Sequence, residues 1–113
     1  MRDQWNINYY QKQAVKTAIY PDSHQIVYPA LGLAGEAGEV ANKVKKFVRD
    51  GYDQEGFELK KGELASEIGD VLWYCAALAN DIGYNLQHIA QGNIHKLNSR
   101  AKRGKIGGDG DNR

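Results

Sequence analysis

The segment EIGDVLWYCAALA, residues 67–79, decides the fold class of this chain. Its apolar residues recur at steps of three and four, and no long stretch of the chain alternates at the two-residue period of a strand. From Val71 to Ala79 the segment is apolar on every side, which is typical of a helix that is buried all round. These patterns predict an all-α protein, a four-helix bundle-like domain.

Helix start and stop signals on both sides of this segment divide the chain into four predicted helices. Their bounds are Ile7 to Tyr20, just after Pro29 to Arg49, Leu59 to Ile82, and the capping residue Asn85 to Arg103, with a polar loop from Tyr52 to Phe57. We predict one helical domain over residues 1–103 and a glycine-rich, charged tail over residues 104–113, whose composition is typical of disorder.

Composition and charge exclude several classes of protein. With 113 residues, 15 of them basic and 14 acidic, the chain has a net charge of +1 and no electrostatic reason to wrap nucleic acid or bind a membrane. Its polar N-terminus has no signal-peptide apolar block, and its longest apolar run is too short to span a bilayer, so we expect a cytoplasmic protein. Cys75 is the only cysteine, which excludes a disulfide within the chain and predicts a buried structural thiol.

Two acidic pairs with the same spacing are the main clue to function. Glu36 and Glu39 lie in the second predicted helix, and Glu67 and Asp70 lie in the third. Residues three apart share a helix face, so each pair points two carboxylates into one small volume, where their repulsion costs stability. If the two helices pack side by side, four oxygen-bearing side chains converge, as a hard divalent cation such as magnesium requires.

An alternative interpretation treats these acids as solvated residues, with Glu39 and Lys43 as an exposed ion pair worth only a few tenths of a kcal/mol. The repeated spacing and three glycines favour the metal site. Gly35, Gly38 and Gly69 each directly precede an acid, and a glycine inside a helix costs about 1 kcal/mol relative to alanine. They indicate close approach by substrate, backbone or a neighbouring helix, and helix packing alone also explains them.

Basic side chains predict a phosphate site. Lys43 and Lys46 continue the polar stripe that begins with the first acidic pair. In the fourth predicted helix, three residues share one face by steps of three and four: Asn93, Lys96 and Arg100. Such residues usually lie on a solvated face. However, magnesium bound to carboxylates normally shares its coordination with substrate phosphates, which also bind Lys and Arg.

The histidines argue against another metal chemistry. No glutamate lies three residues before His24, His88 or His95, so the Glu-x-x-His pattern of di-iron bundles is absent. The sequence also lacks a P-loop, a Gly-x-Ser-x-Gly nucleophile and zinc-ligand spacing. Oxygen ligation of a hard cation remains.

Two aromatic features leave alternatives open. Trp73 points away from the main apolar stripe of its helix, and we expect it either against a second subunit or against the first helix of its own chain. Tyr20, His24 and Tyr28 either stack on a nucleobase or pack the first helix against the core.

The ordered set of motifs resembles the MazG-like nucleoside triphosphate pyrophosphohydrolases, an all-α family related to dimeric dUTPases and phosphoribosyl-ATP pyrophosphohydrolase. The resemblance rests on LGLAGEAGEV at residues 31–40 with the lysines that follow, on EIGDVLWY at residues 67–74, and on NIHKL at residues 93–97 with Arg100. The family pattern of Glu-x-x-Glu followed by Glu-x-x-Asp falls on the two acidic pairs without a departure.

The resemblance implies a catalytic centre in which magnesium, or manganese in its place, is held by Glu36, Glu39, Glu67 and Asp70. It implies hydrolysis of a nucleoside triphosphate to the monophosphate and pyrophosphate, at sites built from helices of two subunits in a homodimer or a dimer of dimers. Contacts to the triphosphate are expected from Lys43, Lys46, Asn93, Lys96 and Arg100. The tail resembles that of one small phage-like and bacterial branch, and Arg113 is its candidate for closing over phosphates.

The intact acids favour an enzyme of nucleotide pool housekeeping that removes unwanted triphosphates. Two alternatives stay open at this point: a narrower dUTPase- or dCTPase-like enzyme, and a non-catalytic nucleotide-binding helical module that keeps the fold without turnover. Neither a membrane nor a nucleic-acid partner is expected.

Overall fold

Helices make up the regular structure of the computed structural model, which describes residues 4–51, 53–104 and 106–108. In chain order the elements are α1 (Ile7–Val15), the short 3-10 helix η1 (Asp22–His24), α2 (Val27–Asp50), α3 (Gln54–Asp81) and α4 (Leu86–Lys102). The described residues contain no strand, so the all-α prediction is confirmed. No described helix combines the length and apolar character needed to cross a membrane.

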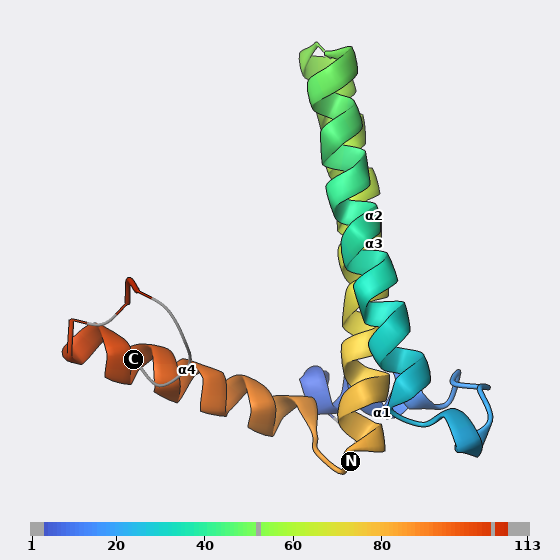
Figure 1. The fold of residues 1–113 in the computed structure, drawn as a ribbon, viewed down its shortest axis with the longest axis vertical. Helices are drawn as coiled ribbons and strands as arrows, with labels where there is room; N and C mark the ends of the chain where they lie inside the picture. The colour runs from blue at the N-terminus through green and yellow to red at the C-terminus, as the bar shows by residue number, and fades with distance from the viewer. Residues whose placement is uncertain (1–3, 52, 105, 109–113) are drawn as a thin grey trace.

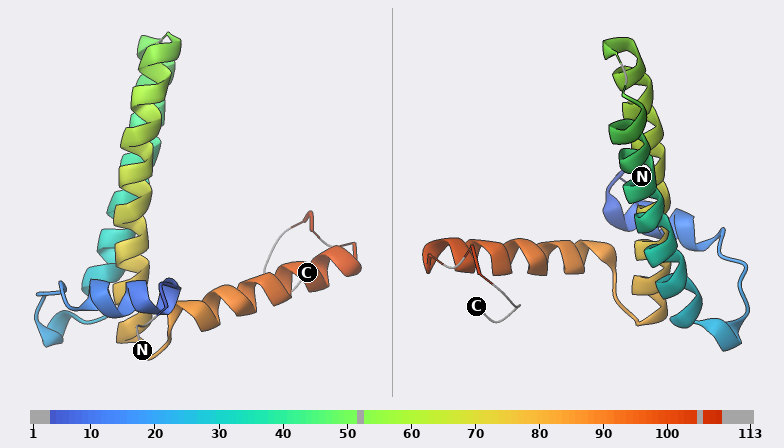
Figure 2. Two further views of the ribbon diagram at one scale, coloured as in Figure 1. Left: turned by 180° about the vertical axis from the view of Figure 1, so that it is seen from behind. Right: turned by 45° about the horizontal axis from the view of Figure 1, so that its top comes forward.

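The long helices α2 and α3 pack along each other as a two-helix arm, which stands upright in Figure 1. Helix α1 crosses the base of this arm and packs on α3. Helix α4 leads away from the arm, as Figures 1 and 2 show from three sides, and it contacts α1 and α3 near its start. The four helices therefore do not form a closed bundle within one chain.

The end of α1 and the starts of α2 and α3 differ from the predicted helix boundaries. Helix α1 ends at Val15 instead of Tyr20, because the backbone N–H and the hydroxyl of Thr17 both donate to the carbonyl of Ala14, at 2.9 and 2.7 Å. Helix α2 begins at Val27, before Pro29 instead of after it. Proline is tolerated there because the first turn of a helix needs no donor from it.

The predicted loop over residues 52–57 is also wrong from Gln54 onward, since α3 begins there and not at Leu59. Asp53 caps this helix, and its side chain accepts a hydrogen bond from the N–H of Gly56 at 2.8 Å. For α4, the predicted cap at Asn85 is confirmed by a 2.7 Å bond from the N–H of His88. Most of the predicted tail, with Arg113, lies outside the described residues.

The core lies at the base of the arm, where α1, α3 and α4 meet. Its buried residues are Ala14, Ala76, Ala79 and Leu86. The segment of α3 predicted to be buried on every side is only partly buried. Ala76 and Ala77 are buried, but Val71 to Cys75 are half-buried. The reason is that, among the described helices, α2 and α1 cover most of α3, α4 adds a smaller contact, and part of its surface stays open.

A buried glutamine joins the helices of this core. The side-chain amide of Gln11 donates to the carbonyls of Ala76 and Tyr84, at 3.2 and 3.1 Å, and its oxygen accepts from the N–H of Leu86 at 2.9 Å. Gln11 is only 6% exposed. One side chain on α1 therefore fixes both the end of α3 and the start of α4.

Candidate metal centre

Three of the four predicted acidic ligands come together on the arm. Glu36 from α2 and Glu67 and Asp70 from α3 each offer a carboxylate oxygen, and these atoms all lie within 4.8 Å of one another. The i,i+3 spacing places Glu67 and Asp70 on the face of α3 that meets α2. The packing of the two helices then adds Glu36, as the matched spacing predicted.

The electrostatics of this acidic trio, Glu36, Glu67 and Asp70, fit a cation. Desolvation, a side-chain hydrogen bond with Glu67, and the charges of Asp70, Glu67 and Glu39 raise the pKa of Glu36 above its ordinary value. The Oε2 atom of Glu67 is buried and has no hydrogen-bond partner within the described residues. An all-oxygen donor set of this kind, with unmet negative charge, matches the ligand preference of magnesium or manganese.

Glu39, the fourth predicted ligand, lies one turn further along α2 and is exposed. Among the described residues it is not part of the group whose oxygens lie within 4.8 Å of one another. Its charge still contributes to the raised pKa of Glu36. Glu39 therefore borders the acidic trio without joining it in this conformation.

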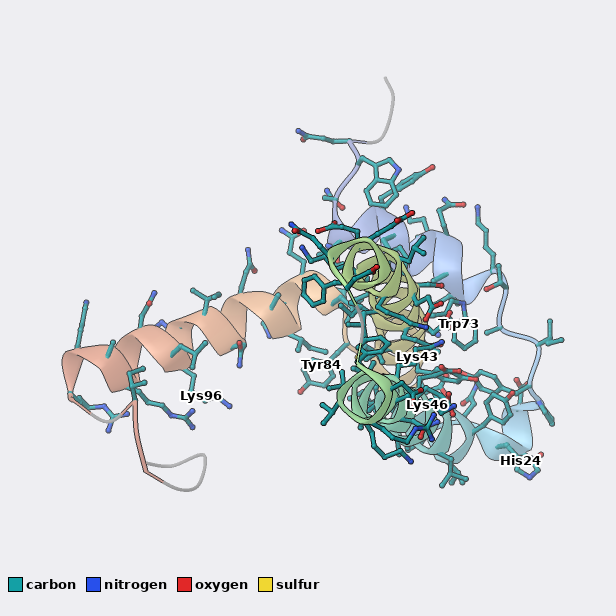
Figure 3. The ribbon with its side chains drawn as sticks, turned by 90° about the horizontal axis from the view of Figure 1, so that it is seen from above. His24, Lys43, Lys46, Trp73, Tyr84 and Lys96 are labelled. Carbon is teal, nitrogen blue, oxygen red and sulfur yellow. The ribbon has the colours of Figure 1, made fainter. Side chains whose placement is uncertain are left out.

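Lys43 pairs across the arm and not along its own helix. Its Nζ lies 3.8 Å from Oε1 of Glu67 and 3.9 Å from Oε2 of Glu63, both on α3. A partly buried ammonium thus offsets some of the charge of the acidic trio. Lys46 follows on α2 and is exposed, and Figure 3 shows both lysines at the junction of α2 and α3.

A hollow opens beside the acidic trio. It has a volume of about 390 Å³ and is lined by Thr17, Glu36, Asp70, Trp73 and Tyr74. The indole N–H of Trp73 donates to the Thr17 hydroxyl at 2.7 Å, and Trp73 packs against the core cluster of its own chain. Of the two interpretations of Trp73, the structure favours packing within the chain.

The sequence patterns did not predict that Thr17 and Tyr74 line this hollow. For Tyr74 a signal exists, because it lies four residues after Asp70 and shares its helix face. Thr17 carries no comparable signal, since it follows the end of α1 and reaches the hollow only through the tertiary fold.

Of the three aromatic residues considered for base stacking, Tyr20 and Tyr28 pack against each other, and His24 contacts Ser23 instead. The rings of Tyr20 and Tyr28 stack with centroids 4.7 Å apart, and Tyr28 lies 6.4 Å from the ring of Tyr74. Tyr20 also donates its hydroxyl to Asp81 at 2.9 Å. His24 lies at the edge of the molecule in Figure 3, where it contacts Ser23. Packing therefore accounts for the two tyrosines.

The polar residues of α4 remain remote from the acids within one chain. Asn93 is exposed, Lys96 is half-buried and Arg100 is only 4% exposed. Helix α4 packs on α1 and α3 near its start, and Figure 3 places Lys96 far along α4, away from Lys43 and Lys46. The structure thus does not bring the two predicted groups of phosphate contacts together in one chain.

The glycines beside the acids have open space next to them. A Cβ atom at Gly35, Gly38 or Gly69 would meet nothing within 4 Å. Packing between the described helices of this chain therefore does not require glycine at these three positions. Gly32 differs, since a Cβ there would clash with the ring of Tyr74, so glycine is what lets this ring lie against α2.

Comparison with known proteins agrees with this geometry. The model of the MazG nucleotide pyrophosphohydrolase domain matches residues 26–104, a range that contains the acidic trio and all of α4. The Gene 37 protein of Mycobacterium phage L5 is 46% identical over 114 residues, which cover 96% of this chain and 99% of that protein. No solved structure matches the chain at a significant level. The chain belongs to the MazG nucleotide pyrophosphohydrolase family.

Proposed function

We propose that this protein is a magnesium-dependent enzyme that hydrolyses nucleoside triphosphates to the monophosphate and pyrophosphate. The observation that carries the proposal is the meeting of Glu36, Glu67 and Asp70 across α2 and α3, within a chain that has the MazG domain. We propose that these three carboxylates hold the metal and that Glu39 joins them from the next turn of α2. Manganese has the same preference for oxygen ligands and is the expected substitute.

The charges around the site suit a triphosphate. A divalent ion held by Glu36, Glu67 and Asp70 would supply Lewis acidity toward the phosphate groups and would lower the pKa of an attacking water. Lys43 lies 3.8 Å from Glu67, which places its ammonium group beside the acidic trio, where phosphate oxygens need a donor. Lys46 lies one turn further along the same helix and extends this basic side of the site.

We further propose that a second copy of the chain completes each site, as a homodimer or a dimer of dimers. The radius of gyration is 17.3 Å, whereas a compact domain of ~100 residues has about 13 Å. The arm exposes large apolar side chains, among them Val48 at 81% and Ile68 at 60%. Asn93, Lys96 and Arg100 lie too far along α4 to serve the trio of their own chain, so in this proposal they serve the partner's.

Light scattering tests the assembly. A mass of two or four chains at micromolar concentration is expected, and a fully active monomer would contradict the shared site. As a matched pair of variants, Val48→Glu is expected to weaken the assembly, while Lys45→Glu, an exposed change on the same helix, is expected to leave it intact.

A panel of canonical and modified nucleoside triphosphates with magnesium tests the reaction. The products must be resolved as monophosphate with pyrophosphate or as diphosphate with phosphate. Monophosphate and pyrophosphate are expected, and diphosphate and phosphate would contradict the reaction class. Turnover confined to dUTP or dCTP would favour the narrower enzyme. Binding without turnover on the whole panel would favour the non-catalytic module.

A further inference from the structure

Asp81, the last residue of α3, accepts two hydrogen bonds from the segment that joins α1 to α2. Its Oδ2 atom accepts from the hydroxyl of Tyr20 at 2.9 Å and from the backbone N–H of Ile26 at 2.9 Å. We call residues 16–26 the connecting segment. One carboxylate oxygen thus holds this segment at both its middle and its end.

The bond to Ile26 holds a strained conformation. Ile26 has φ of 70° and ψ of −56°, and it is the one non-glycine residue with positive φ among those that the structure describes. The N–H of Val27 donates to the carbonyl of Gln25 at 2.7 Å, which closes a γ-turn of the rare, strained type around Ile26. A β-branched residue is disfavoured there. Strain of this kind persists only where surrounding contacts enforce it, and the bond to Asp81 is such a contact.

The connecting segment contributes Thr17 to the lining of the hollow beside the acidic trio. Thr17 lines the hollow directly and accepts the indole N–H of Trp73. Tyr20 stacks on Tyr28, which faces Tyr74, another residue of the hollow. Residues 27–50 follow the strained turn as α2, so the turn at Ile26 also sets where the helix that carries Glu36 begins.

We propose that Asp81 is a positioning residue that fixes the connecting segment at the substrate hollow. The proposal rests on the proposed function, in which the metal-binding acids face the phosphates. In this proposal, the part of the hollow that Thr17 lines faces the part of the nucleotide beyond the phosphates. Asp81 does not touch the trio, which α2 and α3 hold by their own packing. Its loss is therefore expected to weaken substrate binding and to leave magnesium binding unchanged.

Kinetics of two variants at the same position test this role. Asp81→Ala removes both hydrogen bonds, and we expect KM for the nucleotide to rise on the order of tenfold, with kcat within about twofold of the parent. Asp81→Asn keeps an oxygen that accepts from Tyr20 and Ile26, so its KM is expected to stay near that of the parent. A KM unchanged in Asp81→Ala, or raised equally in both variants, would overturn the proposal.

Tyr20→Phe serves as a milder variant if Asp81→Ala does not fold. It keeps the aromatic stack on Tyr28 and loses only one of the two bonds, so a rise in KM of about threefold is expected. The midpoint of magnesium binding, measured without nucleotide, should equal that of the parent in all three variants. A shifted midpoint would show that Asp81 acts on the metal site itself and would overturn the assignment.

Two measurements that need no turnover separate this proposal from the proposed function. Hydrogen exchange at the amide of Ile26 is expected to be fast in Asp81→Ala and slow in Asp81→Asn. Affinity for an α,β-imido nucleoside triphosphate should fall in Asp81→Ala by the same factor as KM rises. If the parent shows no hydrolysis but these two effects are found, the enzyme assignment fails and the positioning role stands. Equal exchange and equal affinity in the two variants would overturn the positioning role.

Discussion

The arm of α2 and α3 carries the predicted metal ligands, whereas the projecting helix α4 carries predicted phosphate contacts. The two regions differ in how they pack within the chain. The arm packs over its whole length and brings three carboxylates from two helices within 4.8 Å. Helix α4 packs on α1 and α3 near its start, and Lys96 lies far along it, remote from the lysines beside those acids. The candidate cation site is thus assembled by packing within the chain, whereas in our proposal the α4 residues act on the site of a partner chain.

The largest effect is expected at the arm. Asp70→Asn removes a ligand charge, and turnover should fall by more than about a hundredfold, since even outer groups of metal sites typically cost 10- to 100-fold when mutated. Magnesium should raise the melting temperature of the parent and hardly change that of the variant. Glu39→Gln is expected to be affected less, because Glu39 lies outside the acidic trio. The control is Glu58→Gln, which changes an exposed acid on α3, the helix of Asp70, and should behave as the parent.

The next largest effect concerns α4. Lys96→Ala should lower kcat/KM by about ten- to a hundredfold, the value of a charge-assisted hydrogen bond to phosphate. Magnesium affinity without nucleotide should not change. Lys96 suits this test better than Arg100, because Arg100 is almost fully buried and its loss would also disturb packing. An unaltered kcat/KM would make Lys96 a surface charge.

Mixing two defective variants sharpens the comparison between the regions. If α4 of one chain serves the acids of another, a dimer of one Asp70→Asn and one Lys96→Ala chain contains one intact site and one doubly defective site. Random pairing should then restore about a quarter of the parent activity. If each chain uses its own α4, every site carries a defect and mixing restores nothing.

A smaller effect is expected from the anchor of α4. Gln11→Ala leaves the N–H of Leu86 and the carbonyl of Tyr84 without their buried partner, which should cost about 1–3 kcal/mol of stability. Thermal or urea unfolding measures this. Gln13→Ala on the same helix is the control, because the side chain of Gln13 accepts an exposed hydrogen bond from Lys16. Equal melting of the two variants would show that Gln11 does not fix the junction.

The smallest effect is the pH dependence of the metal-free protein. The raised pKa of Glu36 means that the folded state holds this proton more tightly than the unfolded chain. Stability is therefore expected to fall as pH rises from the ordinary carboxyl pKa of 4.5 through the raised value, and to level off above it. Glu36→Gln should remove this slope in melting curves recorded without metal. Magnesium should oppose the loss, because it favours the ionised carboxylate.

Part of the candidate site followed from spacing alone. Pairs three residues apart on a helix share a face in any fold, so Glu67 with Asp70 needed no tertiary information. That Glu36 would join them required only that α2 pack on α3, which their apolar stripes favoured. The separation of Glu39 from the trio depends on how far along each other the two helices pack, and no local pattern encodes this register.

The sequence by itself determined the helical class, the cap at Asn85 and the acidic pairs, because each depends on residues within one or two helical turns. The tertiary structure alone decided the contact of Thr17 with Trp73 and the two hydrogen bonds that Asp81 accepts from Tyr20 and Ile26. These contacts join residues more than 50 positions apart. The hydrogen bond to Asp81 stabilises a positive φ at Ile26, a backbone conformation that the local sequence disfavours. Local periodicity therefore identified the candidate ligands, and long-range packing formed the hollow beside them.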